Sequence, residues 1–204
     1  MFAFALTLLV VSLEVPRTFD DLMHTMRGFA AFAISFMFLM QIWFKHYGFF
    51  RRYGLQDVPT RLLNSVLLFI VLFYVYPLKF LWTHMVPGGG QPDFSANEAR
   101  TLLFIYGLGG ATVFTIFAML HQHAWRLRDA MELNALERFD THAAIIENYM
   151  MAAVPLVSAL LAVVLPANLV GLAGTFYFVY APLMTWNGIR EGRGRRALEQ
   201  AAKE

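Results

Sequence analysis

The chain of 204 residues contains no cysteine and little charge. Without cysteine it can form no disulfide, no thiolate metal site and no cysteine nucleophile. Charged residues make up 15% of the sequence, whereas a typical soluble domain carries about 25%. Hydrophobic residues make up 58% of it and are grouped into blocks. This composition indicates an integral membrane protein.

Motifs typical of enzymes are also absent from the sequence. There is no serine nucleophile with a nearby base, no paired-carboxylate motif and no phosphate loop. The apolar blocks hold no aspartate or glutamate at mid-depth, which argues against proton-coupled transporters and pumps. The pI is near 9.0, but the basic residues lie beside apolar blocks, which favours a topological role over nucleic-acid binding. We therefore expect a membrane protein that is not an enzyme, binds no nucleic acid and holds no metal or cofactor.

The apolar blocks predict an all-α fold with six transmembrane helices. No block shows the alternation of a membrane β-strand, and the backbone of a span in lipid must satisfy its own hydrogen bonds. The predicted spans are approximately 1–14, 24–46, 61–84, 98–125, 143–165 and 168–188. Together they form one transmembrane domain over 1–190, which is followed by a cytoplasmic basic tail over 191–204.

The connections between the spans differ in length. The link Pro166–Leu169 is so short that the last two spans must form a tight antiparallel hairpin. Residues 86–100 are rich in glycine and proline and indicate an exposed loop. Within that loop, Ser95 and Glu98 predict a capping box that opens the fourth span. Residues 121–140 are polar but have helical spacing, so we expect them to extend the fourth helix beyond the membrane.

Lysine and arginine are unequally distributed between the two sides of the membrane. With a cytoplasmic N-terminus, one side carries Lys45, Arg51, Arg52, Arg61, Arg126, Arg128, Arg138, Arg190, Arg193, Arg195, Arg196 and Lys203. The other side carries only Arg17, Arg27, Lys79 and Arg100. This bias predicts that both termini face the cytoplasm. The residues expected to anchor the span ends at the interface are Trp43, Trp82, Trp125 and Trp186.

Four polar residues near span ends are candidates for chemistry. His121 and His123 lie two residues apart, so on a helix they point about 200° from each other. Helical metal pairs need a spacing of three or four residues, so we expect an interface or loop role for both. Asn64, just inside its span, is expected to hydrogen-bond across helices. Glu147 is assigned to the external end of its helix and is expected to be solvated at the interface.

The first apolar segment carries a helical stripe. Phe4, Thr7, Leu8, Val11 and Val15 fall at i, i+3, i+4, i+7 and i+11, which places them on one face. An ordinary packed helix explains this spacing. An apolar stripe with one threonine could also line a narrow pore.

Two stretches, FAFALTLLVVSLEVP and IWFKHYGFFRRYGLQDVPTRLLNSVLLFIVLFYVYPLKFL, together resemble the transmembrane protein 175 family. These proteins are the endolysosomal potassium channel and its bacterial six-helix relatives. The matching positions are Trp43, His46, Phe50, Arg51, Asp57, Asn64 and Pro77. The resemblance covers roughly residues 2–82, and the later half fits in its pattern of spans.

The resemblance implies a potassium-permeable channel in the bacterial inner membrane, with potassium as the permeant ion and the lipid bilayer as its surroundings. It implies a homotetramer with the first helices around the central axis. The implied constriction consists of bulky apolar rings at Phe4, Leu8 and Val11, with Thr7 as a polar ring between them. The implied structural polar contacts near the pore are Trp43, His46 and Asn64. The alternative is a non-conducting membrane scaffold or small-molecule carrier with the same fold.

The sequence departs from the family pattern at its start. The family's first helix opens with an arginine and a Phe-Ser-Asp triplet, and this chain has neither. The apolar run from Met1 to Leu13 spans about 20 Å, whereas the hydrocarbon core is about 30 Å thick. We therefore expect that the beginning of the first helix is missing from this sequence. The polar network that braces this helix in the family is not carried over.

Overall fold

The computed structural model describes residues 7, 17–27, 29–85 and 95–201, and every regular element in these ranges is a helix. The prediction of an all-α fold is confirmed. Within the described ranges, four segments are long and apolar enough to cross a membrane. They are Val58–Leu78, Ala96–Arg126, Ala135–Val164 and Ala167–Gln200. The count of six spans stays a prediction, since the first segment lies outside the described residues except at Thr7.

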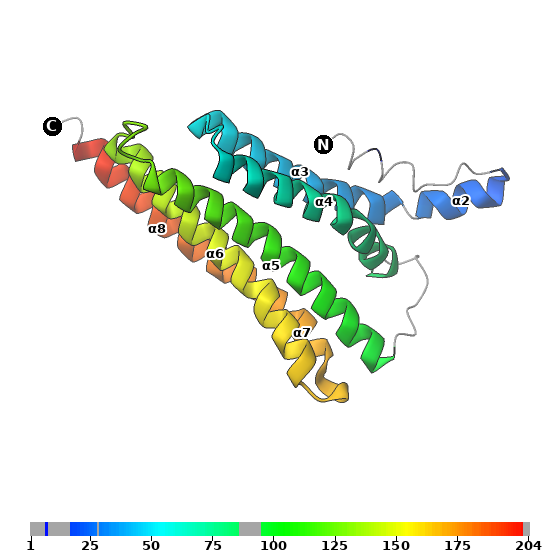
Figure 1. The fold of residues 1–204 in the computed structure, drawn as a ribbon. Helices are drawn as coiled ribbons and strands as arrows, with labels where there is room; N and C mark the ends of the chain where they lie inside the picture. The colour runs from blue at the N-terminus through cyan, green and yellow to red at the C-terminus, as the bar shows by residue number, and fades with distance from the viewer. Residues whose placement is uncertain (1–6, 8–16, 28, 86–94, 202–204) are drawn as a thin grey trace. The chain divides into compact units, whose positions relative to one another are not determined.

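The chain divides into two compact units, and the first comprises Met1–Arg51 and Ser65–Phe94. Its helices are α2 (Phe19–Arg27), α3 (Phe29–Tyr53) and α4 (Val58–Met85), which Figure 1 labels. The last two residues of α3 and the first residues of α4, up to Asn64, are assigned to the second unit. The short turn between α3 and α4 contains Gly54 with a φ of +60°. Glycine adopts this left-handed conformation without steric cost, which allows the chain to reverse direction there.

Helix α4 is apolar on several sides, as expected of a helix in lipid. Four of its residues form a buried stripe with a spacing of three or four: Leu67, Val71, Val75 and Leu78. Aromatic side chains remain exposed on the rest of its surface: Phe69, Phe73 and Tyr76. Such exposed aromatic surface is unusual for a soluble protein and ordinary for one that contacts lipid.

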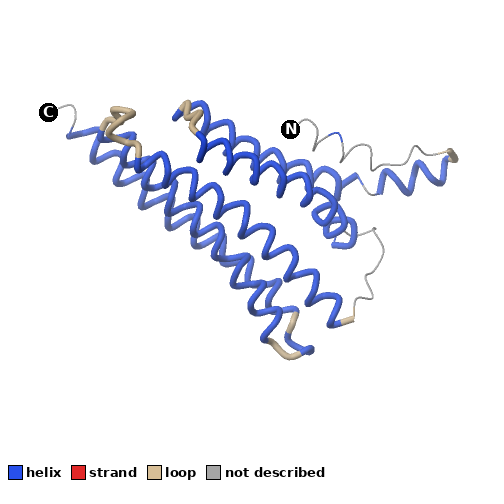
Figure 2. Tube along the Cα trace, in the orientation of Figure 1, coloured by secondary structure: helices blue, strands red, loops and turns tan. Residues whose placement is uncertain are grey.

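The second unit comprises Arg52–Asn64 and Ser95–Glu204. Its elements are α5 (Ala96–Arg126), α6 (Ala135–Val164), the 3-10 turn η1 (Ala167–Leu169), α7 (Gly171–Thr175), the 3-10 turn η2 (Phe176–Val179) and α8 (Tyr180–Ala201). Helix α6 packs against both α5 and α8, and the three run side by side (Figures 1 and 2). Helix α6 is therefore the central element of this unit.

The hairpin predicted from the short link after α6 is confirmed. Ser158 on α6 donates a hydrogen bond of 2.7 Å to the Ala173 carbonyl on α7. Further from the turn, Arg195 on α8 reaches Asp140 near the start of α6. Residues later on α8 thus contact residues earlier on α6, so these two helices run antiparallel.

Capping boxes begin both α5 and α6. The predicted box of Ser95 and Glu98 is confirmed, with both reciprocal hydrogen bonds present. A second box, which the sequence analysis did not identify, joins Asn134 and Glu137 at the start of α6. The expectation that residues 121–140 extend the fourth helix is therefore wrong beyond Arg126. The chain turns there, and the Asn134 cap starts a new helix that satisfies its first amide groups.

Helices α5 and α6 approach closely at Gly107. A Cβ atom at this position would lie 2.4 Å from the Pro155 carbonyl oxygen and 2.7 Å from the Ala159 Cβ. Both distances are below any normal contact, so only glycine fits without a shift of the α6 backbone. Gly107 therefore sets the distance between the two helices at the level of the proline.

Arg100 links the beginning of α5 to the end of α6. Its guanidinium group donates hydrogen bonds of 2.8 Å to the Ala162 carbonyl and 2.7 Å to the Leu165 carbonyl. The last carbonyls of a helix have no partner within the helix, and a cation near them also matches the negative end of the helix dipole. Arg100 therefore caps α6 from a neighbouring helix.

Residues 191–201 of the expected basic tail continue α8 as a helix. This part of α8 remains in contact with α6, because Gly194 leaves room for the ring of Phe139. A Cβ at Gly194 would lie 2.6 Å from the Phe139 Cζ atom. The described part of the tail is thus packed on the helical unit along one side.

Candidate functional site

Three of the four predicted pore residues, Phe4, Leu8 and Val11, lie outside the described residues. Thr7 is described, and it is helical and exposed. Its helical state agrees with the spacing used to predict the stripe. The pore-lining role of all four residues stays a prediction.

The predicted polar contacts near the pore fall in different units, so each is described by itself. In the first unit, Trp43 stacks on Tyr47 with ring centroids 5.5 Å apart, and the His46 ring lies 4.7 Å from the Phe50 ring. In the second unit, Asn64 is half-buried on α4. The location of the three beside a pore stays a prediction.

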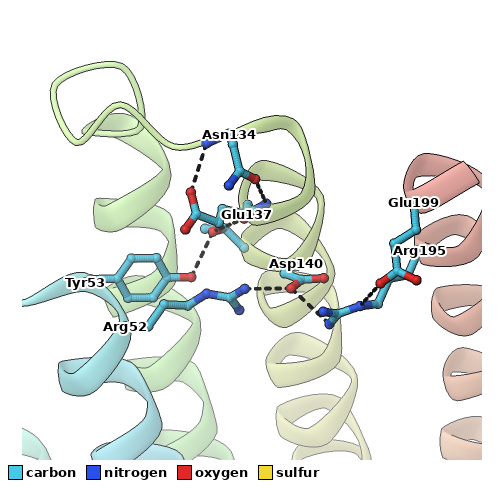
Figure 3. Close-up of polar contacts among 8 residues, drawn as sticks. Arg52, Tyr53, Asn134, Glu137, Asp140, Arg195 and Glu199 are labelled. Atoms are coloured by element: carbon cyan, nitrogen blue, oxygen red, sulfur yellow. Dashed lines mark hydrogen bonds and ion pairs between the residues drawn. The ribbon is translucent and has the colours of Figure 1, made fainter. Parts of the chain in front are cut away.

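The second unit contains a polar cluster where the turn after α3 meets the ends of α5, α6 and α8. We call it the linker cluster, and it comprises Arg52, Tyr53, Asp57, His123, Asp140, Thr141 and Arg195. Figure 3 shows most of these side chains, with those of α3 and α8 converging on α6. Partners within the cluster are separated by 55 to 88 residues in sequence. The cluster therefore exists only in the folded chain.

Tyr53 joins the end of α3 to α6 by a buried hydrogen bond. Its hydroxyl lies 2.8 Å from the Thr141 Oγ1 atom, and Thr141 itself donates to the Glu137 carbonyl at 2.7 Å. Because a threonine hydroxyl has one hydrogen, which is committed to Glu137, Tyr53 is the donor to Thr141. Burial raises the pKa of Tyr53 above its ordinary value. The phenol therefore stays protonated and able to donate at neutral pH.

Asp140 is shared by two arginines from different segments (Figure 3). Its Oδ2 atom lies 2.6 Å from Arg52 and 3.2 Å from Arg195. Arg195 also contacts Glu199 one turn further along α8, at 3.1 Å. The Asp140 side chain is 12% exposed, whereas those of Arg52 and Arg195 are 37% and 51% exposed. The arginines can therefore turn to water, but the carboxylate depends on them for compensation of its charge.

Asp57 joins the start of α4 to the end of α5. It precedes α4, and its carbonyl accepts a hydrogen bond of 3.0 Å from the Arg61 amide. Its carboxylate contacts the Nε2 atom of His123. The nearby Thr60 hydroxyl, followed by the His123 imidazole, lowers the pKa of Asp57. The Thr60 Oγ1 atom and the Asp57 Oδ1 atom are both buried, and neither has a well-formed hydrogen bond within the described residues.

His121 and His123 have separate partners, as their spacing requires. The Nδ1 atom of His121 lies 2.8 Å from the Phe117 carbonyl oxygen, and its ring contacts the Tyr53 ring edge-on at 5.8 Å. His123 instead faces Asp57. Across the described part of the chain, no group of three or more His, Asp or Glu side chains is arranged to hold a metal. From α5, His121 therefore contacts the end of α3, and His123 contacts the turn that follows it.

An open cavity of about 380 Å³ lies beside the linker cluster, between α6 and α8. Its charged lining residues are Arg52, Asp140, Glu147, Glu191 and Arg195. Glu147 therefore lies at the same end of α6 as the arginines that the charge bias assigns to the cytoplasm. The external assignment of Glu147 and the cytoplasmic assignment of these arginines are therefore incompatible.

The sequence analysis did not identify Tyr53, Asp140 or Arg195 as a connected group. Asp140 offers one local signal, since it is an acidic residue between basic segments and just before an apolar block. Its partners lie 88 and 55 residues away. No helical period relates residues at such separations, so only the packed structure brings them together.

The sequence is similar to a family model and to proteins named potassium channel. Residues 1–75 match the family model described as endosomal/lysosomal potassium channel TMEM175. A protein of Marivirga tractuosa named potassium channel is 39% identical over 215 residues, which cover 98% of this chain and 87% of that protein. A protein of Chamaesiphon minutus, also named potassium channel, is 24% identical over 150 residues, which cover 70% of this chain and 68% of that protein.

A solved structure is similar over nearly the whole chain. It is the crystal structure of a variant of the potassium channel MtTMEM175 in complex with a Nanobody-MBP fusion protein. The TM-score is 0.84 at 38% sequence identity, with 94% of this chain and 89% of that chain covered. Similarity in sequence and fold over this length shows common descent. The chain therefore belongs to the TMEM175 family of potassium channels.

Proposed function

We propose that this protein is a channel that conducts potassium ions across the bacterial inner membrane. The observation that carries the proposal is the identity of 39% to a protein named potassium channel, over 98% of this chain. The long apolar helices supply the membrane setting that such an activity needs. An ion channel also requires no nucleophile, cofactor or paired acid and base.

The proposed conduction path is formed by the first helix of each subunit in a homotetramer. The apolar positions Phe4, Leu8 and Val11 are the proposed constriction, and Thr7 is the polar ring between them. Their spacing on one helical face and the helical state of Thr7 support this assignment. Rings of apolar side chains can gate a pore by dewetting, and a threonine hydroxyl can replace part of the water shell of an ion.

Both termini are proposed to face the cytoplasm. The excess of lysine and arginine on one side supports this orientation. Under this assignment the linker cluster and the basic end of α8 lie at the cytoplasmic surface. Arg100 and the turn between α6 and α8 then lie at the opposite surface.

Potassium flux through the purified chain in liposomes tests the proposal. We expect potassium efflux above that of empty liposomes, and a clear reduction of potassium flux in the isosteric variant Thr7→Val. Thr185→Val removes a hydroxyl that bonds the Ala181 carbonyl on α8, and should leave the flux unchanged. No flux above that of empty liposomes, from protein that remains folded, would instead favour the non-conducting scaffold or carrier.

A further inference from the structure

One face of α8 carries arginines that take no part in the contacts between helices. The outer face of α8 comprises Trp186, Ile189, Arg190, Arg193 and Arg196, all of which are exposed. At about 100° per residue, the five lie within a sector of about 120°. The basic residues are therefore gathered along one line of the helix surface.

The opposite face of α8 is occupied by packing against α6. Asn187 is 3% exposed, Gly194 lies against Phe139, and Arg195 reaches Asp140. The acidic residues of α8, Glu191 and Glu199, have partners within α8 itself. Glu191 accepts a hydrogen bond of 2.6 Å from Asn187, and Glu199 contacts Arg195.

The outer arginines keep their charge available for another partner. Within the described ranges, no ion pair involves Arg190, Arg193 or Arg196. The two α8 carboxylates have other partners, since Glu191 accepts from Asn187 and Glu199 contacts Arg195. Arg195 differs from these three arginines. It is adjacent to Arg196 in sequence, but it forms ion pairs with two carboxylates, those of Asp140 and Glu199.

The outer face begins at a residue suited to the membrane interface. Tryptophan is enriched at the level of the lipid headgroups, and Trp186 is 56% exposed at the end of the apolar part of α8. The Arg190 guanidinium lies over its ring, 5.9 Å from the centroid. The next two arginines follow within about 9 Å along the helix. Measured from Trp186 along the helix, Arg190 and Arg193 lie within about one Debye length, roughly 10 Å, of the headgroup layer, and Arg196 lies about 15 Å away.

We propose that the outer face of α8 binds the phosphate groups of anionic phospholipids in the membrane leaflet from which α8 emerges. A guanidinium group can donate two parallel hydrogen bonds to a phosphate, and arginine is less strongly hydrated than lysine. Each basic residue near an anionic membrane surface strengthens binding by about five-fold. The exposed Trp186 and Ile189 side chains then contact the upper part of the acyl chains.

The test uses the full chain in nanodiscs that contain brominated phosphatidylglycerol or, separately, brominated phosphatidylcholine. Bromine quenches nearby tryptophan fluorescence, and the variant Trp186→Phe identifies the part of the signal that belongs to Trp186. We expect Trp186 to be quenched preferentially by phosphatidylglycerol. In the double variant Arg190→Gln/Arg193→Gln this preference should fall by about an order of magnitude. Arg190→Lys/Arg193→Lys should retain most of it.

The matched control is Arg51→Gln/Arg126→Gln, which removes the same charge from exposed positions elsewhere and should keep the preference. Equal quenching by the two lipids would overturn the proposal, as would an equal loss in the control variant. Displacement of the signal by inorganic phosphate would assign the face to a free anion. A change in oligomeric mass of the α8 variant, without a change in lipid preference, would assign it to contacts between copies of the chain.

Discussion

The hydroxyl of Tyr180 donates a hydrogen bond of 2.6 Å to the main-chain carbonyl of Met151. This carbonyl is four residues before Pro155, which lies inside α6 and has no amide hydrogen to offer it. In lipid, where water cannot compensate, a backbone carbonyl without a partner is costly. Tyr180 therefore replaces the helical hydrogen bond that Pro155 removes, and it does so from α8.

Tyr180→Phe should lower the free energy of unfolding by about 1–3 kcal/mol, because it leaves the Met151 carbonyl without a donor. Thermal unfolding of the detergent-solubilised protein measures this loss. Tyr149→Phe, at an exposed position of the same helix pair, should have little effect. In a Pro155→Ala background the new amide can bond Met151, so Tyr180→Phe should cost clearly less. An equal cost in both backgrounds would contradict the replacement.

Gly107→Ala should destabilise the pairing of α5 and α6. The added methyl group would lie 2.4 Å from the Pro155 carbonyl oxygen, and overpacking of this kind typically costs about 1–3 kcal/mol. Gly48→Ala is the control, since a Cβ there meets nothing within 4 Å and alanine is the better helix former. Equal unfolding temperatures of the two variants would show that α5 and α6 separate without cost.

Stability at acidic pH should depend on Asp57. Its pKa in the folded protein is lowered from an ordinary value of 3.8 by the Thr60 hydroxyl and the His123 imidazole. A carboxyl group whose pKa is lowered by folding stabilises the protein at pH values above its ordinary pKa. This stabilisation is lost as the pH falls through the pKa that the group has in the folded protein. We expect the wild type to lose stability more steeply than Asp57→Asn as the pH falls below about 4. The control Asp20→Asn, at an exposed position, should follow the wild type.

Cysteine labelling should place the two ends of α6 on opposite sides of the membrane. The chain has no native cysteine, so any labelling of a single-cysteine variant comes from the introduced residue. Ala167→Cys, in the turn after α6, should react with an impermeant reagent added to intact cells. Ala130→Cys, in the turn before α6, should react only after the cells are opened. Both alanines are exposed, and the reverse pattern would overturn the proposed orientation.

Replacement of Phe4 tests the proposed constriction. Four phenyl rings around the axis would form a bulky, dry barrier, and although their faces attract cations, they offer no lone pairs to replace water. We judge the steric and dewetting barrier to be the larger effect. Phe4→Ala should therefore raise cation flux in liposomes and weaken the preference for potassium over sodium. Phe36→Ala, on α3, should do neither, and unchanged potassium and sodium fluxes in Phe4→Ala would remove Phe4 from the pore.

Much of the helical architecture follows from local patterns in the sequence. Long apolar blocks predict helices in lipid, and a link as short as Pro166–Leu169 leaves no alternative to a hairpin. The Ser95 capping box can be predicted from the sequence because all its groups lie within four consecutive residues. The same pattern is present at Asn134 and Glu137, but the polar residues around it also have the spacing of a continuous helix.

The polar contacts between helices could not be predicted in the same way. Tyr180 and Met151 are 29 residues apart, and Arg52 and Asp140 are 88 apart. Proline in a predicted helix does indicate a carbonyl in need of a donor, but several hydroxyl groups could supply it. Which one does so depends on the register between α6 and α8, and that register is set by side-chain packing.

The contacts at the two ends of α5 and α6 also determine how these helices respond to membrane thickness. Arg100 joins the start of α5 to the end of α6. At the other end, Tyr53 at the end of α3 binds α6, and Asp57 in the following turn binds α5. Neither helix can slide along the other without breaking one of these attachments. A helix that is too long for its bilayer commonly tilts. In this protein, α5 and α6 must tilt together as one rigid pair when the bilayer becomes thinner.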